Sequence, residues 1–394
     1  MIRQNIACQS IAHLQCFFPI AEHIIMSSHC WIEIHLERLE HNFRRLKELF
    51  PNMTLAPVLK SDAYGHGAVE CARRLEAIGA QRLAVFSVDE ALELRRSGIA
   101  TRIWIIGGAL PEEAEEAVSM ENVAVGAWNR ENIQALSEAA VRLNRTAEIH
   151  LAVDTGMSRL GFFEAEMPEV IAWVQSLPGI RLAGLYSHLA SPGMPDESQT
   201  TAQRECFARV AAMMPACCRE IHLAALPGLA AQVGMEYGFG RPGVAVYGYG
   251  PGENLLPGLE QMMEFKSRVI SVKTIPAGRY ISYGMTYRIG EQDAPQRIAV
   301  VPIGYADGYP RLQSNRGRVL VHGSYAPIRG RVCMGMVMVD VTAIPDVRPG
   351  DEVVLLGHQG GRAITADEIA DNAQTISYEV LCNLGKAKDR RFIG

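Results

Sequence analysis

The sequence lacks several features that mark specialised classes of protein. Its nine cysteines include no Cys-x-x-Cys pair and are odd in number, which argues against a disulfide framework and against a structural zinc site. A formal net charge of -5 provides no basic surface for nucleic acid. The apolar patch at 17–21 is too short to cross a membrane and is interrupted at once by Glu22 and His23. We therefore expect a cytoplasmic enzyme that acts on a small molecule, without metal, nucleic acid or membrane partners.

What the sequence does have is a regular series of short apolar runs. At 394 residues the chain exceeds the usual size of a single core, so two domains are expected. The runs alternate with amphipathic segments, a pattern typical of parallel strands buried on both faces and joined by helices. Eight such units predict an α/β fold of the TIM-like (β/α)8 barrel type, whose active site lies at the C-terminal ends of the strands. The eight runs are 55–60, 83–87, 103–107, 123–128, 149–154, 182–189, 221–226 and 244–249.

After residue 262 the pattern changes to runs separated by glycine, proline and aspartate turns. Such a pattern predicts a mostly antiparallel β domain. We therefore predict a poorly ordered N-terminal extension at 1–30, a barrel at 31–262 and a β-rich C-terminal domain at 263–394. The runs in this last domain are 265–275, 297–303, 318–322, 331–341 and 352–356, followed by helical stretches at 366–372 and 378–384.

A lysine ends the first apolar run of the predicted barrel. Apolar residues before Lys60 would desolvate its amine, and Gly65 and Gly67 after it would let a ligand approach the backbone closely. A solvated lysine that merely closes a strand is the ordinary alternative. The segment 57–67, however, resembles the cofactor-lysine motif of alanine racemases, which use pyridoxal 5'-phosphate, and the resemblance continues through most of the chain after residue 30.

This resemblance implies a set of residues that bind pyridoxal phosphate. The arginine of Arg-Pro-Gly-Val, Arg241, would face the pyridine nitrogen, and its permanent charge would keep that nitrogen unprotonated. The phosphate would be held by hydroxyls and by backbone N–H groups, and a histidine would lie against the ring. The residues implied are Lys60, Tyr64, Tyr378, Gly243, Val244 and His188.

Racemisation requires a proton to leave one face of the α-carbon and return to the other, so two bases must flank it. The family pattern assigns these roles to Lys60 and to the tyrosine of a Ser-Tyr-Gly segment, here Tyr283, which reaches the active site of the other subunit. The resemblance therefore implies a homodimer with shared sites and a small amino acid as substrate. It assigns substrate binding to Arg159, Cys333, Met334 and Tyr305.

Three positions depart from the family pattern. Leu226 stands in place of a serine that binds the phosphate, and the loss of one hydroxyl contact costs on the order of 1–3 kcal/mol. Ala152 stands in place of a lysine, often carbamylated, that orients the neighbouring arginine. Gly335 stands in place of an aspartate near the substrate and adds backbone freedom. Both proposed bases are intact, so we expect catalysis with altered supports.

The leading hypothesis is a racemase that interconverts L-alanine and D-alanine and supplies D-alanine for peptidoglycan. Racemisation of another small amino acid, such as serine, is a first alternative because Leu226 and Gly335 loosen the site. A non-catalytic pyridoxal-phosphate protein is a second, motivated by the weakened supports. A decarboxylase on the same barrel fold is a third, but the segment around Tyr283 argues against it because decarboxylation needs no second face-specific base.

Overall fold

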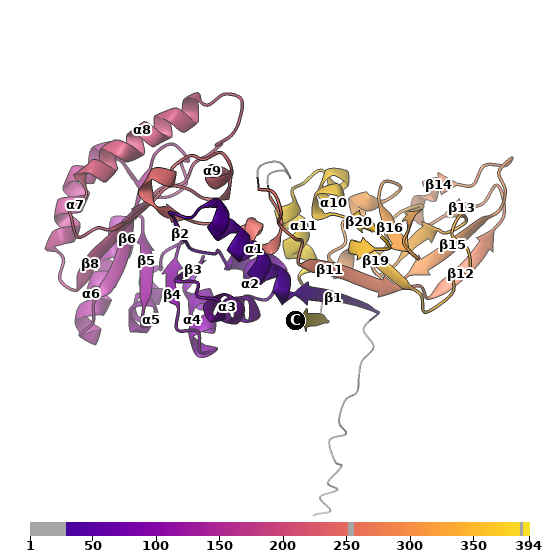
Figure 1. Cartoon of the computed structure of the whole chain (residues 1–394), viewed down its shortest axis with the longest axis horizontal. Helices are drawn as coiled ribbons and strands as arrows, with labels where there is room; N and C mark the ends of the chain where they lie inside the picture. The colour runs from indigo at the N-terminus through magenta and orange to yellow at the C-terminus, as the bar shows by residue number, and fades with distance from the viewer. Residues whose placement is uncertain (1–28, 251–255, 387–388) are drawn as a thin grey trace, which may run out of the picture.

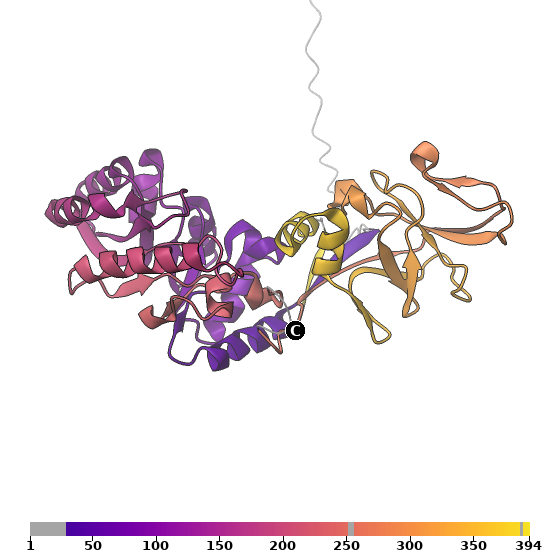
Figure 2. The ribbon, with the colours of Figure 1, turned by 90° about the horizontal axis from the view of Figure 1, so that it is seen from above.

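The computed structural model describes residues 29–250, 256–386 and 389–394. They form two lobes, a barrel coloured indigo to magenta and a β-rich lobe coloured orange to yellow (Figures 1 and 2). Apart from its last two residues, the predicted extension at 1–30 lies outside the described residues. Within the described part of the chain, no helix combines the length and apolar character needed to cross a membrane.

The first lobe contains the predicted parallel strands of a barrel. Six strands pair in the order β3-β4-β5-β6-β8-β9, and β10 pairs with β2. Parallel bridges between Val58 and Ala84 and between Ala225 and Arg241 join these two sets into a ring. The strands are β2 (Thr54–Leu55), β3 (Arg82–Val85), β4 (Arg102–Ile105), β5 (Val123–Ala127), β6 (Ala147–Asp154), β8 (Ile180–Tyr186), β9 (Glu220–His222) and β10 (Phe239–Gly240), with β7 (Phe162–Phe163) beside β6.

Amphipathic helices follow the barrel strands. In α6 (Arg130–Leu143) the buried residues Ile133, Leu136 and Ala140 recur at helical spacing, and the Asn129 side chain accepts a hydrogen bond from the Asn132 backbone N–H at the helix start. This helix is one of the amphipathic segments that the sequence pattern predicts between the apolar runs. The others in this lobe are α1 (Leu36–Leu49), α2 (Lys60–Gly65), α3 (Ala68–Ala77), α4 (Val88–Arg96), α5 (Ala114–Ser119), α7 (Met167–Ser176), α8 (Ser198–Met213) and α9 (Leu226–Ala230).

The predicted position of the last barrel strand, 244–249, was wrong. Residues Val244–Tyr247 form the 3-10 helix η4, and the eighth strand is the earlier β10. All four residues of η4 are buried, and a short helix without a polar face has the same continuous apolar pattern as a buried strand. Arg241 therefore follows the last strand, at its C-terminal end, and does not precede it.

The second lobe is mostly antiparallel, as predicted, but it also takes in the first described strand. Strand β1 (Cys30–His35), which the sequence pattern assigned to the barrel, pairs antiparallel with β11 and parallel with β21. The run 265–275 is divided between two sheets, and the run 331–341 contains only β18. The remaining elements are β11 (Met263–Arg268), β12 (Ser271–Ile275), β13 (Tyr280–Ile281), β14 (Tyr287–Arg288), β15 (Gln296–Val301), β16 (Arg318–Val321), β17 (Ser324–Pro327), β18 (Val337–Asp340), β19 (Glu352–Gln359), β20 (Arg362–Ile364), α10 (Ala366–Ala373), α11 (Ser377–Leu384) and β21 (Arg390–Ile393).

Candidate active site

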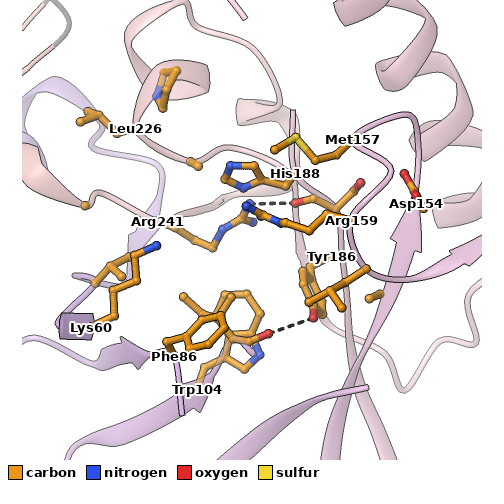
Figure 3. A pocket seen from close by; sticks show the side chains of 18 of the residues that line it. Lys60, Phe86, Trp104, Asp154, Met157, Arg159, Tyr186, His188, Leu226 and Arg241 are labelled. Carbon is orange, nitrogen blue, oxygen red and sulfur yellow. Dashed lines mark hydrogen bonds between the residues drawn. The ribbon is translucent and has the colours of Figure 1, made fainter. Parts of the chain in front are cut away.

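A cavity of about 600 Å³ lies at the C-terminal ends of the barrel strands. Lys60 and Arg159 approach it from opposite sides, with Arg241 and His188 between them (Figure 3). Tyr378 joins the lining from α11 of the second lobe, so the cavity uses both lobes of one chain. The residues of the sequence prediction that line it are Lys60, Tyr64, Arg159, His188, Arg241, Gly243 and Tyr378.

Many of these side chains have polar groups with no partner in the protein. Within the described chain, no hydrogen bond or ion pair involves the Lys60 amine, the Arg159 guanidinium, the His188 ring or the hydroxyls of Tyr64 and Tyr378. Apart from Arg159, which is exposed, these residues are at least partly buried. Buried polar groups are usually paired, so a concentration of unpaired ones around a cavity indicates a polar ligand. Several of the unpaired groups are donors, and such a set favours a ligand that carries negative charge.

The Lys60 amine is presented by an unusual turn at the start of α2. Residues 61–64 have φ between 54° and 55°, a left-handed conformation that costs roughly 1–2 kcal/mol for each residue other than glycine. Glu90 Oε1 accepts a hydrogen bond of 2.6 Å from the Ser61 backbone N–H, and Asp62 Oδ1 accepts one of 2.7 Å from the Ala68 backbone N–H. These contacts stabilise the strained turn.

The second lobe also holds this turn. Asp62 Oδ2 lies 2.7 Å from Arg390 Nη1 of β21, and Arg390 Nη2 donates to the Gly385 carbonyl at 2.7 Å. A Cβ atom on Gly65 would lie 2.7 Å from the Leu381 carbonyl oxygen and 2.8 Å from Gly385 Cα, so only glycine allows α2 to approach α11 this closely. The position of Lys60 therefore depends on both lobes.

The electrostatic environment shifts the pKa values of several of these groups. Burial lowers the pKa of Lys60, and the nearby Arg159 charge lowers it further. Burial, reinforced by Arg241 and Arg159, lowers the pKa of His188 to about 3, so this ring is neutral at physiological pH. Burial lowers the pKa of Arg241 to about 10, which leaves the guanidinium charged. The cavity thus combines a readily deprotonated amine with a fixed positive charge.

Arg241 is 4% exposed and has no carboxylate as a direct partner among the described residues. Its Nη1 donates to His222 Nδ1 at 2.8 Å, and its Nη2 donates to the Ser187 carbonyl at 2.8 Å. The Arg241 guanidinium carbon lies 5.7 Å from the centre of the Trp104 ring. The sequence prediction missed both His222 and Trp104, because each looks like an ordinary member of an apolar run.

The remaining predicted site residues lie elsewhere. Val244 is fully buried and does not line the cavity. Tyr283, Cys333, Met334 and Tyr305 belong to the second lobe and also do not line it. The last three lie close together, since the backbone N–H of Tyr305 donates to the Cys333 carbonyl at 3.1 Å and that of Ala306 to the Met334 carbonyl at 2.9 Å. Tyr283 and Met334 are 72% and 63% exposed.

The three departures from the family pattern occupy different surroundings. Ala152 and Leu226 are buried and line the cavity, where each presents an apolar surface. A Cβ atom on Gly335 would have no neighbour within 4 Å, so this glycine leaves open space on the second lobe. Two of the three departures therefore change the wall of the cavity, and the third changes an open position on the second lobe.

The residues around the cavity fit pyridoxal 5'-phosphate, the cofactor implied by the resemblance. An amine, a buried guanidinium and two unpaired hydroxyls supply groups suited to its aldehyde, its pyridine nitrogen and its phosphate. At Gly243 a Cβ atom would lie 2.8 Å from the Tyr64 hydroxyl, so a side chain there would fill the space beside that hydroxyl. The chemistry of these groups and the shape of this space are both compatible with the cofactor.

Comparison with known proteins agrees with this interpretation. Residues 34–251 match the family model of the alanine racemase N-terminal domain, and residues 262–392 match that of the C-terminal domain. An alanine racemase from Syntrophobacter fumaroxidans is 43% identical over 370 residues, which cover 93% of this chain and 98% of that relative. The solved alanine racemase of Clostridium difficile 630 superposes with a TM-score of 0.84 at 31% identity, covering 93% of this chain and 96% of that one. The alanine racemase of Bacillus anthracis with bound L-Ala-P gives a TM-score of 0.83 at 30% identity, with 93% and 95% covered.

Proposed function

Because this chain belongs to the alanine racemase family, we propose that it interconverts L-alanine and D-alanine with pyridoxal 5'-phosphate as cofactor. One observation carries the proposal: the Lys60 amine and the Arg241 guanidinium face a single cavity that also contains two unpaired tyrosine hydroxyls. We place the reaction in the cytoplasm, where D-alanine would be available for peptidoglycan.

Pyridoxal phosphate, when bound, supplies an electron sink for the negative charge that develops at the α-carbon. Lys60 would hold the cofactor covalently, and its amine, with its pKa lowered by burial, would accept or return the α-proton on one face. Arg241 would donate to the pyridine nitrogen and, being always charged, would keep a proton off it. A weaker electron sink limits side reactions such as transamination.

The remaining residues of the cavity would bind and orient the cofactor and the substrate. The hydroxyls of Tyr64 and Tyr378, with the backbone of Gly243 and Val244, would hold the phosphate. His188, neutral because its pKa is near 3, would lie against the pyridine ring without adding charge. The unpaired guanidinium of Arg159 would bind the substrate carboxylate.

We propose that Tyr283 of a second copy supplies the base for the opposite face. Tyr283 is 72% exposed, and Met285, Met334 and Met336 of the same lobe are also largely exposed. Exposed apolar side chains in such number are typical of a surface that another protein covers. In a two-fold dimer the second lobe of each chain would meet the barrel mouth of the other, which would bring Cys333, Met334 and Tyr305 to the substrate as well.

Cofactor content and racemisation together test this function. Purified protein incubated with pyridoxal phosphate should show a visible absorbance band that borohydride abolishes, and peptide mapping should find the reduced adduct on Lys60. The protein should then convert L-alanine to D-alanine at equal final amounts of the two enantiomers. A protein that binds no cofactor, or that binds it on another lysine, would contradict the proposal.

Serine is a second candidate substrate, because Gly335 leaves open space where the family pattern has an aspartate. Comparing kcat/KM for L-alanine and L-serine under the same conditions decides between them. We expect the higher value for alanine, and a higher value for serine would reassign the substrate while leaving the reaction type unchanged.

A further inference from the structure

A chain of buried polar side chains leads away from Arg241 through the interior of the barrel. His222 Nδ1 accepts from Arg241 Nη1 at 2.8 Å, and His222 Nε2 lies 2.9 Å from His150 Nδ1. His150 Nε2 in turn lies 3.0 Å from Glu220 Oε2, within ion-pair distance but outside hydrogen-bond geometry. Both histidines are 0% exposed, and the Glu220 side chain is 16% exposed. Arg241 follows the last barrel strand, whereas Glu220 begins β9, so the chain runs from the cavity toward the opposite end of the barrel.

The chemistry of the two end residues, Arg241 and Glu220, determines which ring nitrogen of each histidine carries the proton. Arginine can only donate, so His222 Nδ1 must accept and the proton of this ring must lie on Nε2. His222 therefore donates to His150 Nδ1, which leaves the His150 proton on Nε2, where it faces Glu220. An ionised carboxylate can only accept, so the direction set by Arg241 and the direction set by Glu220 agree.

The surroundings keep the two imidazoles neutral and the two ends charged. Burial lowers the pKa of His150 and lowers that of His222 still further below the usual value, with the positive charge of Arg241 adding to the effect at His222. Burial alone would raise the pKa of Glu220, but the close contact with His150 and the hydrogen bond from Arg82 outweigh it and lower this pKa. Glu220 Oε1 also lies 2.8 Å from Arg82 Nη2 and 3.4 Å from an Arg102 nitrogen.

Aromatic rings surround the two histidines. Trp104 lies 4.4 Å from His222 and 5.5 Å from His150 between ring centres, and Phe239 lies 4.5 Å from His222. Tyr186 stacks on His222 with an interplanar angle of 10°. These rings hold the imidazoles in one orientation, and they add no carboxylate that could pair with Arg241.

We propose that His222, His150 and Glu220 are positioning residues that fix the orientation of the Arg241 guanidinium and help to balance its buried charge from across the barrel. The inference rests on the proposed role of Arg241 toward the pyridine nitrogen. Some N–H groups of Arg241 are held by His222 and by backbone carbonyls. The guanidinium is therefore fixed in orientation, and an N–H group that is not used in this way can donate to a ligand in the cavity. Glu220 then affects the cofactor without touching it.

The first test uses cofactor-free full-length protein labelled with ¹⁵N-histidine. Nitrogen NMR should show His222 and His150 each as the neutral form protonated on Nε2, with assignments from His222→Phe and His150→Phe. In Glu220→Gln the side-chain oxygen can still accept and Arg241 still fixes the direction from the other end, so both rings should keep their proton on Nε2. A wild-type spectrum with either ring protonated on Nδ1 would overturn the proposal, whatever the variants do.

The second test uses the cofactor-loaded enzyme and follows its visible absorbance against pH. We expect Glu220→Gln and His150→Phe to shift the midpoint of this titration by at least about half a pH unit. The first change removes the negative charge at the end of the chain, and the second breaks the chain between Glu220 and His222. Glu264→Gln is the matched control: Glu264 is also a buried carboxylate paired with cations, but it lies in the second lobe.

The two tests separate failure of this inference from failure of the proposed function. Protein that takes up no pyridoxal phosphate would contradict the proposed function, and the NMR result would still decide the direction of the chain. Protein that binds the cofactor on Lys60 but gives the same midpoint in wild type, Glu220→Gln and His150→Phe would show that the chain does not act on the cofactor. A shift of equal size in Glu264→Gln would show the same.

Discussion

The barrel face and the face of the second lobe differ in how far each is organised within one chain. On the barrel face, Lys60, Tyr64 and Arg241 line one cavity, and contacts with Glu90 and Arg390 hold the strained turn that carries Lys60. On the other face, Tyr283 and Met334 lie on the surface and contribute nothing to that cavity. Under the proposed function, the cofactor half of the site is preformed within one chain, whereas the second base would come from another copy.

Removing the Lys60 amine should abolish the preformed half and give the largest effect. We expect Lys60→Ala to lose the borohydride-sensitive absorbance band and at least about ten-thousandfold in racemisation rate, because the covalent hold on the cofactor and one base disappear together. Absorbance and D-alanine formation are the measurements. Lys273→Ala, an exposed lysine of β12, is the control and should behave as wild type. Retention of the band in Lys60→Ala would place the cofactor elsewhere.

Removing the Tyr283 hydroxyl should leave the preformed half intact and impair only one direction of proton transfer. Tyr283→Phe should slow α-proton removal from one enantiomer by about 10²–10⁴-fold and from the other far less, because the two bases serve opposite faces. Single-turnover exchange of the α-proton with deuterated water, started from each enantiomer, measures this. Equal losses from both enantiomers would remove Tyr283 from its face-specific role. Tyr280→Phe, in the same β13–β14 hairpin, is the matched control.

Two glycines with different surroundings allow the tightness of packing near the Lys60 turn and around Gly335 to be compared. A Cβ atom on Gly385 would overlap the backbone of Gly65, whereas one on Gly335 would meet nothing within 4 Å, and neither glycine has positive φ. Gly385→Ala should lower the free energy of unfolding by about 1–3 kcal/mol and disturb the Lys60 turn. Gly335→Ala should change it by less than about 0.5 kcal/mol. Urea unfolding measures both, and similar values for the two variants would contradict the contrast.

The parts of the fold that could be predicted from the sequence are those set by local patterns. The bounds of α6 follow from its apolar spacing and from the cap at Asn129, and the barrel rhythm follows from the apolar runs. The pairing of β1 with β11 could not be predicted, because their register joins segments more than 200 residues apart (Cys30 with Ser267). The left-handed turn after Lys60 could not be predicted either, since long-range contacts with Glu90 and Arg390 select it.

The candidate site could be predicted in a similarly uneven way. Lys60 and Arg241, which lie in segments that closely resemble the family motifs, line the cavity as the sequence predicts. His222, His150 and Glu220 were missed because their relation is one of donors and acceptors across two strands, β6 and β9, and no local pattern records it. This relation emerges only when the barrel closes and brings the side chains of β6 and β9 together in its interior, although β8 separates the two strands in the sheet.

The smallest expected effect concerns Leu226, the buried residue that departs from the family pattern on the barrel face. Leu226→Ser would place a hydroxyl on the cavity wall at the start of α9, and we expect pyridoxal phosphate to bind about fivefold more tightly, equivalent to about 1 kcal/mol. The same change removes buried apolar surface and should lower the stability of the cofactor-free protein. Leu229→Ser, in the same helix but off the cavity, should lower stability without tightening binding. The affinity is measured by fluorescence titration. Unchanged or weaker binding of pyridoxal phosphate by Leu226→Ser would show that a hydroxyl at this position does not contribute to cofactor binding.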